Sequence, residues 1–436
     1  MLQALRLENV GPAPKMEMEL APRLNLITGD NGLGKSFLLD VAWWALTRRW
    51  PHDLNPDLTS GYAARPTDRK KPARISFRVD TNGRSVDYTS TYVPRAQAWE
   101  GKSGRPLMGG LVIYAHTDGG FSVWDPARNY WQAKGKVDVQ DRIPGYVLSP
   151  QEVWNGLHVP IDGELTLVCQ GLLADWMTWI IKRGPDAARM DAALRLLTSS
   201  CNGDDGIEPS SNFARLSVND ARDIPMVRMK YGQDVPILYA SVGVRRIAAL
   251  AYITSWAWRE HLIASSQLGE EPTTRIVLLI DEVESHLHPR WQRSILNSLL
   301  QVGKTMHDDV KVQLIATTHS PLVMASTEPL FDLEHDAWFD LDFDGEPPSV
   351  HLRKRIYVPH GDVSNWLTSN AFDLKSARSL EGERAVEKAR ALMRQSVARI
   401  EDARAIDDEL RRSGMPDIDP FWVRWGYFME KIGAGV

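Results

Sequence analysis

Residues 29 to 36 have the types and spacing of a phosphate-binding loop. They read Gly29, Asp30, Asn31, Gly32, Leu33, Gly34, Lys35 and Ser36, which fits the pattern G-x-x-x-x-G-K-S in full. Glycines let the backbone curl so that several N–H groups point inward at phosphate oxygens. Lys35 would then reach the β- and γ-phosphates of ATP, and Ser36 would ligate Mg²⁺. The alternative interpretation is a chance glycine turn.

The elements around this phosphate loop fit the first interpretation. An apolar strand is expected over residues 24–28, directly before the loop, and a largely apolar helix over residues 37–44, directly after it. The N-terminal end of that helix adds partial positive charge where phosphate would lie. The strand, loop and helix therefore predict ATP binding at residues 29–36.

A second apolar strand ends in two carboxylates. Residues 277–280 are Val, Leu, Leu and Ile, and Asp281 and Glu282 follow them. In a protein with a phosphate loop this is the Walker B pattern, in which Asp281 would hold Mg²⁺, often through water. Glu282 would be the general base for the water that attacks the γ-phosphate. The alternative is a pair of acids that merely ends a strand at the surface.

A histidine follows the next apolar strand. The run from 310 to 317 predicts a strand, and Thr318 and His319 come after it. Such a histidine can hydrogen-bond the γ-phosphate and hold the attacking water in line, although it can also be an ordinary polar residue at a strand end. We therefore predict Glu282, His319 and Lys35 as the catalytic side chains.

Composition limits the classes of function. The net charge of −5 is unusual for a protein coated by nucleic acid, so DNA binding would need a local basic patch at residues 65–74 or 353–355. With only Cys169 and Cys201, the chain has no disulfide framework, which fits a reducing cytoplasm. No run of about 18 apolar residues occurs, so no membrane span is expected.

Taken together, these motifs resemble the ABC ATPase superfamily, in the soluble branch that includes SMC and RecF proteins. The segment 240–251 is similar to the signature of that family, S-x-G-x-x-R-x-x-A-L-A. The resemblance implies that Ser241 and Gly243 contact the γ-phosphate held by the other protomer of a dimer. By itself, a serine and a glycine before a helix usually form only a cap.

The resemblance also implies a glutamine loop that joins the two lobes of the ATPase. Gln170 is the candidate, because it follows an expected strand at 163–169 and precedes an expected helix. Gln132, Gln140 and Gln151 compete with it.

Two further segments point to a narrower group. Residues 281–289 look like the D-E-x-E-x-H-L-H-P stretch of overcoming-lysogenization-type and related prokaryotic defence ATPases. The tail, including residues 366–369 and 372–374, looks like those of PtuA-like antiphage ATPases. Asp340-Leu341-Asp342 lies in an expected hairpin and lacks the preceding glutamate of a Toprim domain, so no nuclease activity is expected.

The resemblance implies an α/β fold: a two-lobed ABC-type P-loop ATPase with a helical insertion and a C-terminal helical tail. We expect an N-terminal lobe over 1–169, a helical insertion over 170–235, a C-terminal lobe over 236–360 and the tail over 361–436. Within these, residues 200–224 are expected to be irregular and residues 379–412 to form one helical stripe.

The leading hypothesis is a cytoplasmic ATPase subunit of a bacterial antiphage defence complex. It would act as a homodimer or higher homo-oligomer, with ATP and Mg²⁺, and would control a separate nuclease or toxin. One alternative is a RecF-like repair ATPase that binds DNA directly. Another is a scaffold that holds ATP and restrains an effector with little turnover.

Overall fold

The computed structural model describes residues 1–81, 83–101, 110–129, 142–161, 163–199, 207–346, 348–395 and 398–433. The chain divides into two compact units, Met1–Pro359 and His360–Val436, which are described separately below. Within the described residues, no helix is both long enough and apolar enough to cross a membrane.

The first unit is built on an eight-stranded sheet in the order β18-β17-β3-β16-β15-β7-β8-β9. The five strands from β17 to β7 run parallel, and β18, β8 and β9 pair antiparallel at the two sides. Parallel strands are covered on both faces, which explains why β15 reads as a continuous apolar run. The bounds are β3 Leu24–Gly29, β7 Leu111–Ala115, β8 Phe121–Trp124, β9 Tyr146–Leu148, β15 Arg275–Ile280, β16 Lys311–Thr317, β17 Asp336–Asp344 and β18 Ser349–Arg355.

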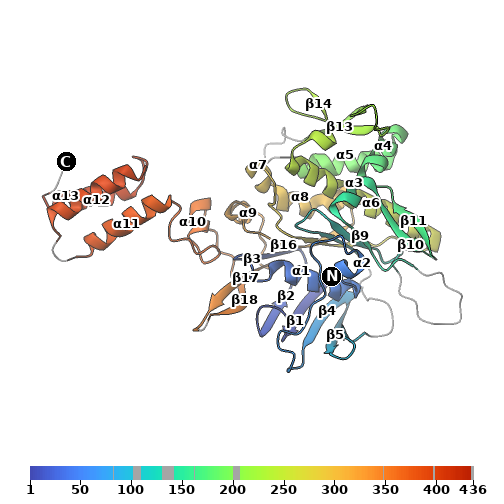
Figure 1. Ribbon diagram of the computed structural model, residues 1–436, viewed down its shortest axis with the longest axis horizontal. Coiled ribbons are helices and arrows are strands. Elements are labelled where there is room, and N and C mark those ends of the chain that lie inside the picture. Colours follow the sequence, from blue (N-terminus) through green and yellow to red (C-terminus); the bar gives the residue numbers. More distant parts are fainter. Residues whose placement is uncertain are drawn as a thin grey trace. The chain divides into compact units, whose positions relative to one another are not determined.

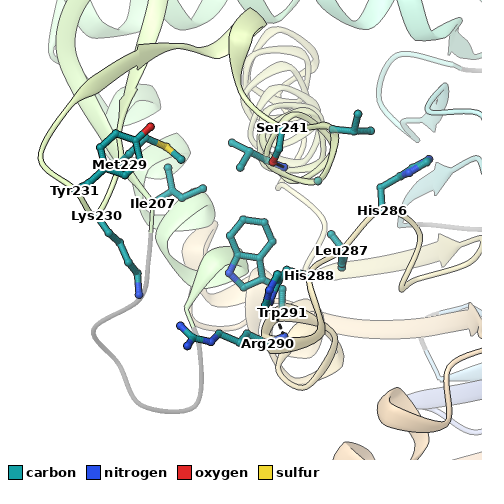
Figure 2. Close-up of a pocket in the computed structure, with 13 residues that line it drawn as sticks. Ile207, Met229, Lys230, Tyr231, Ser241, His286, Leu287, His288, Arg290 and Trp291 are labelled. Carbon is teal, nitrogen blue, oxygen red and sulfur yellow. Dashed lines mark hydrogen bonds between the residues drawn. The ribbon is translucent and has the colours of Figure 1, made fainter.

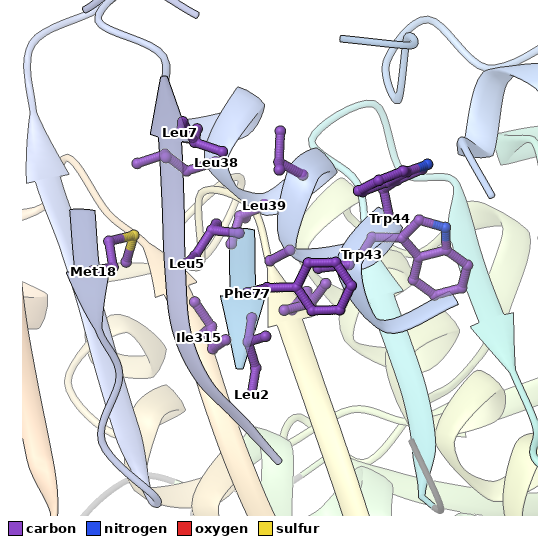
Figure 3. Packing of buried hydrophobic residues seen from close by; sticks show 14 of the residues in the cluster. Leu2, Leu5, Leu7, Met18, Leu38, Leu39, Trp43, Trp44, Phe77 and Ile315 are labelled. Atoms are coloured by element: carbon purple, nitrogen blue, oxygen red, sulfur yellow. The ribbon is translucent and has the colours of Figure 1, made fainter. Parts of the chain in front are cut away.

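A second, antiparallel sheet has the order β2-β1-β4-β5-β6. Helix α1 (Lys35–Thr47) packs between this sheet and the eight-stranded sheet, and one core cluster contains side chains from all three (Figure 3). Because α1 is covered on nearly every side, residues 37–44 are apolar without a clear stripe. The strand bounds are β1 Leu2–Glu8, β2 Lys15–Glu19, β4 Arg74–Thr81, β5 Arg84–Val93 and β6 Ala98–Trp99.

Helices including α4, α5, α6 and α8 gather on the side of this unit away from the antiparallel sheet (Figure 1). The longest is α6 (Val242–Leu268), which begins at the N-cap Ser241 and contacts β7. The predicted start of α3 at Ser149 is confirmed by a capping box with Glu152. The remaining helices of the described residues are α2 Pro51–Leu54, α3 Pro150–Asn155, α4 Leu172–Lys182, α5 Pro185–Thr198, η1 Ile237–Tyr239, α7 Pro289–Gln292, α8 Ile295–Gln301, η2 Val302–Thr305 and α9 Pro321–Thr327.

The segment expected to be a helical insertion, 170–235, is only partly helical. It holds α4 and α5 and then β12 (Glu208–Ala214), β13 (Ile224–Arg228) and the start of β14 (Asp234–Pro236), which form a small sheet. The expectation of irregular structure was wrong for 208–214, because tertiary pairing with β13 overrides its weak strand propensity. A hairpin of β10 (Leu157–Ile161) and β11 (Glu164–Cys169) precedes this segment.

The second unit contains α10 (Val363–Leu367), α11 (Leu380–Met393), α12 (Ile400–Arg412) and α13 (Phe421–Lys431). The last three helices share an apolar core. The expected single helical stripe over 379–412 was wrong: α11 ends at Met393 and α12 begins at Ile400. Both helices face the same core, so their apolar spacing does not reveal the break between them.

Burial of Asp40 in α1 gives a prediction about pH and stability. Burial is the main cause that raises the pKa of this carboxyl from 3.8 to about 7, while a hydrogen bond from the Tyr114 hydroxyl partly opposes it. The folded protein therefore holds this proton more tightly than the unfolded chain. The resulting stabilisation is full below pH 4 and is lost as the pH rises to about 7, by at most about 4 kcal/mol.

The free energy of unfolding should thus fall less steeply between pH 4 and 7 in Asp40→Asn than in the wild type. Chemical denaturation at a series of pH values measures this slope. Asp53→Asn, at an exposed position of α2, is the control and should keep the wild-type slope. Equal slopes for Asp40→Asn and wild type would contradict the prediction.

Candidate active site

The predicted site residues gather at one edge of the eight-stranded sheet. In the parallel register, Ile280 of β15 lies opposite Ala316 of β16 and Ala115 of β7, and Thr317 lies opposite Ile27 of β3. The carboxyl ends of four neighbouring strands are therefore level with one another. Ligands of open α/β sheets bind at this edge, where strand order reverses.

The phosphate loop has the backbone that its glycines predict. Gly29, Gly32 and Gly34 have φ of 134°, 81° and 97°, a region that other residues rarely adopt. A Cβ on Gly29 would also lie 2.3 Å from the Leu341 carbonyl oxygen. Gly29 and Gly34 are thus required both by their conformation and by the close approach of neighbouring atoms. Gly32 is required by its conformation alone, since a Cβ there meets open space.

Two features of this loop fit a polyphosphate. Lys35 Nζ donates to the carbonyl oxygens of Gly29 and Asp30, both at 2.8 Å, so its ammonium lies over the loop. At the N-terminus of α1, no side chain of the described residues caps the helix at Gly34. The first-turn N–H groups, including that of Ser36, are therefore directed at the space that the loop encloses. Burial lowers the pKa of Lys35, and the nearby Asp281 and Glu282 oppose that shift.

Asp281 is held by two hydroxyls. Thr317 donates to its Oδ1 at 2.8 Å, Thr117 donates to its Oδ2, and the residue is only 2% exposed. Each carboxylate oxygen keeps a second lone pair, which suits a role toward a cation. Among the described residues, no group of three or more His, Cys, Asp or Glu side chains could hold a metal by itself. The Asp281 carboxylate and the Ser36 hydroxyl are oxygen donors of the kind that Mg²⁺ takes from a protein when substrate phosphates and water supply its other ligands.

Glu282 has an unusual backbone conformation. Its φ is +47°, in the left-handed region, which costs on the order of 1 kcal/mol or more for a residue with a side chain. Its N–H donates to the Thr317 hydroxyl at 2.7 Å, and the next N–H, of Val283, donates to the Thr317 carbonyl at 3.1 Å. Thr317 thereby fixes both the Asp281 carboxylate and the bend that turns Glu282 out of the strand.

His319 lies near these groups. Burial is the main cause that lowers its pKa, the charge of Lys35 lowers it further, and Glu284, Glu282 and Asp281 oppose the shift. The imidazole is therefore neutral at pH 7, with one nitrogen able to accept a hydrogen bond and the other able to donate one. The structure brings Lys35, Asp281, Glu282 and His319 together, from three separate segments of the chain.

Ser241 and Gly243 lie elsewhere. They line a cavity of about 710 Å³ together with the turn after β15 and the loop between β13 and β14 (Figure 2). No residue of the phosphate loop, 29–36, lines this cavity. Ser241 caps α6 by accepting a hydrogen bond from the Val244 N–H at 3.4 Å. A Cβ on Gly243 would lie 2.4 Å from the His286 carbonyl oxygen. Within one chain, the glycine of the signature segment is thus explained by close packing.

The glutamine candidates are separated by the structure. Gln170 is exposed and stands between β11 and α4, as the sequence predicted, and its role in a glutamine loop stays a prediction. Gln151 is exposed in the first turn of α3. Gln132 and Gln140 lie outside the described residues.

Sequence reasoning missed three residues at this edge. Thr117 follows β7 and Thr317 ends β16, and both hold Asp281. Arg246 donates to the carbonyl oxygens of Thr117 at 3.1 Å and Asp281 at 3.2 Å, which ties α6 to the strand end. Thr117 is the second polar residue after an apolar strand, since His116 stands between it and β7, and this position was the available signal.

Residues 24–325 match the family described as "AAA domain, putative AbiEii toxin, Type IV TA system". This match covers more than half of the chain, and the chain belongs to that family. The predicted α/β fold class is confirmed by the largely parallel eight-stranded sheet and its helices. The predicted similarity to PtuA-like ATPases is confirmed by the relatives described next.

Three curated relatives match shorter segments. The Retron Vc95 probable ATPase of Vibrio cholerae is 29% identical over 116 residues, and the Retron Ec83 probable ATPase of Escherichia coli is 27% identical over 165 residues. The Septu protein PtuA of Bacillus mycoides is 46% identical over 99 residues. These segments are 27%, 37% and 22% of this chain, but only 21%, 26% and 12% of the respective relatives.

Two solved structures are similar to this chain over most of its length. The SMC head domain from Thermotoga maritima has a TM-score of 0.38 and 14% identity, covering 81% of this chain and 99% of that one. The recombination mediator protein RecF has a TM-score of 0.39 and 14% identity, covering 82% and 98%.

The double role of the Thr317 hydroxyl can be tested with Thr317→Val, which keeps the shape of the side chain. The change leaves Asp281 Oδ1 and the Glu282 N–H without this partner, so the free energy of unfolding should fall by about 1–3 kcal/mol. Thr254→Val is the matched control, because that buried hydroxyl bonds only to carbonyls of its own helix. Chemical denaturation of both variants measures the difference, and equal losses would refute the assigned role of Thr317.

Proposed function

We propose that this protein binds ATP with Mg²⁺ and hydrolyses it. The observation that carries the proposal is the convergence of the phosphate loop, Asp281, Glu282 and His319 at one edge of the sheet. The family match to an AAA domain and the relatives named as probable ATPases support it.

The geometry suggests a role for each side chain. The loop N–H groups and Lys35 bind the phosphates. Ser36 and Asp281 would hold Mg²⁺, which would supply positive charge to neutralise the phosphate oxygens. Glu282 accepts the proton of the attacking water, and the neutral His319 orients that water or the γ-phosphate. The α1 N-terminus and Lys35 stabilise the charge that develops during transfer.

We further propose that two copies complete each site. The cavity beside Ser241 and Gly243 does not include the phosphate loop of the same chain, and Ser241 is exposed, so the start of α6 is open to the nucleotide of a second copy. A helix N-terminus of this length favours an anion. ATP would then join two protomers and hydrolysis would release them, which makes the dimer a switch.

The wider role we propose is an ATPase subunit of a bacterial antiphage defence complex in the cytoplasm that controls a separate nuclease or toxin. The similarity to retron ATPases and to the Septu protein PtuA supports the defence setting. In this scheme 1–169 and 236–360 are the two ATPase lobes, 170–235 is the insertion that carries Gln170, and 361–436 is a docking tail.

Direct DNA binding is a second candidate, favoured by the exposed basic side chains of residues 65–74. Two of these are already paired: Lys71 with Asp68 at 3.7 Å and Arg74 with Glu8 at 3.6 Å. Neutralisation within the protein weakens attraction to a phosphate backbone. We therefore rank this role below effector control.

Replacement of the proposed general base should separate hydrolysis from binding. Glu282→Gln should lower kcat by about 100-fold or more, since the amide cannot take the proton, while ATP binding persists. Measurements of phosphate release and of molecular mass, with and without DNA, should show an ATP-dependent dimer. Glu270→Gln, at an exposed position after α6, should retain wild-type turnover.

The outcomes of this experiment distinguish the alternatives. Negligible turnover in the wild type, with ATP held in a stable assembly, would favour the scaffold. Turnover that depends on DNA and falls steeply with salt would favour the RecF-like role.

The tail can be tested through α13. Val423 and Tyr427 lie one turn apart and are 78% and 72% exposed, opposite the buried Phe421 and Trp425. A helix that binds in a groove of a partner protein does so through apolar side chains at this spacing. Val423→Asp with Tyr427→Ser should abolish co-purification with the product of the neighbouring gene and leave ATP turnover unchanged. Arg404→Asp, on the exposed side of α12, is the control, and retained co-purification in the double variant would refute docking here.

A further inference from the structure

Glu284 joins the turn after β15 to the segment after β16. Its Oε2 accepts a hydrogen bond from the Thr318 hydroxyl at 2.7 Å, and its Oε1 accepts one from the backbone N–H of His319 at 2.6 Å. Both donors lie at or next to the residue that carries the imidazole. Because hydrogen bonds to an ionised carboxylate are roughly twice as strong as neutral ones, this link is a firm constraint on the His319 backbone.

The same turn carries Glu282. The left-handed conformation of Glu282 starts the turn, and a hydrogen bond from the Ser285 N–H to the Glu282 carbonyl at 2.8 Å closes it around Glu284. Glu284 is therefore placed by the residue two positions before it. The carboxylate that fixes His319 thus moves with the proposed general base.

We propose that Glu284 is a positioning residue for ATP hydrolysis: it holds His319 at a fixed place relative to Glu282. This inference rests on the proposed ATPase activity. Glu284 acts through the two groups that it fixes and needs no contact with the nucleotide. Loss of the link lets the imidazole drift from the line of attack, while the phosphate loop and its affinity for ATP remain.

A second link in the same region provides a matched control. Ser320 donates to Gln292 Oε1 at 2.8 Å, which anchors the start of α9 to α7. It starts from α7, which follows the turn of Glu284, and reaches the same segment after β16, but it holds Ser320 and leaves the His319 N–H untouched. If only general stiffness mattered, removal of either link would have the same effect on turnover.

Steady-state kinetics of the full chain test the proposal. Glu284→Gln leaves one amide oxygen for two donors, so kcat should fall by about 10- to 100-fold, while KM for ATP changes less than about threefold. Glu284→Asp keeps the charge and should retain more activity than Glu284→Gln. Gln292→Ala should change kcat by less than about threefold, and a loss equal to that of Glu284→Gln would overturn the proposal.

A double variant isolates the route through His319. His319→Ala removes the group that Glu284 positions, so adding Glu284→Gln to it should cause no further loss of kcat. If the fold-losses of kcat in the two single variants multiply in the double variant, the proposal is overturned, while the proposed ATPase function still stands. Absence of turnover in the wild type would instead remove the proposed function, and this role with it.

The pH dependence of kcat provides a further test, because a general loosening of the site would not shift the pKa of His319. Burial and then the charge of Lys35 lower the pKa of His319, whereas Glu284, Glu282 and Asp281 raise it. Removing the charge of Glu284 should lower this pKa further, so the acid limb of the kcat profile should shift to lower pH in Glu284→Gln. An unchanged acid limb would count against the placement of Glu284 beside His319.

Discussion

The parallel pairing of β15 with β16 is the constraint on which the proposed site depends. It places the ends of the two strands level, so that Thr317 stands beside Asp281 and Glu282. A slip of one residue would turn the Thr317 side chain to the other face of the sheet and remove both of its hydrogen bonds. The register is in turn fixed by apolar residues that pack on both faces, so the core of the sheet determines the geometry of its polar edge.

The choice of partners for Asp281 has an electrostatic consequence. Thr117 and Thr317 are neutral donors, so they orient the carboxylate without cancelling its charge. An arginine in either place would have satisfied the same oxygens but would have reduced the attraction for a cation. Burial of a carboxylate with neutral partners is costly, and a nearby positive charge lowers that cost. Lys35 and Mg²⁺ would both serve this purpose in the proposed complex with a magnesium nucleotide.

The sequence predicts the parts of this site whose spacing is local. The phosphate loop, the carboxylates after β15 and the histidine after β16 each stand within a few residues of a recognisable strand or helix. Thr117 and Glu284 act across the sheet, and their partners are 164 and 35 residues away in sequence. Such pairs require the strand order, which hydrophobic pattern does not give. The same limit explains β12, whose strand structure depends on pairing, and the break between α11 and α12, which the shared core conceals.

Arg246 extends this reasoning from one protomer to two. Its guanidinium is buried, which lowers its pKa, and it joins the carbonyls of Thr117 and Asp281 to α6. Ser241, the N-cap of the same helix, precedes Arg246 by five residues, and Gly243 precedes it by three. The surface offered to a second copy is therefore tied to the strand end of the first. In the proposed dimer, Ser241 of one protomer would contact the γ-phosphate bound by the other protomer. Ser241 caps α6, and Arg246 of this helix is hydrogen-bonded to Asp281 of the same protomer. The two sites would thereby share α6 as one element, and loss of the γ-phosphate at either site would change the forces on the other.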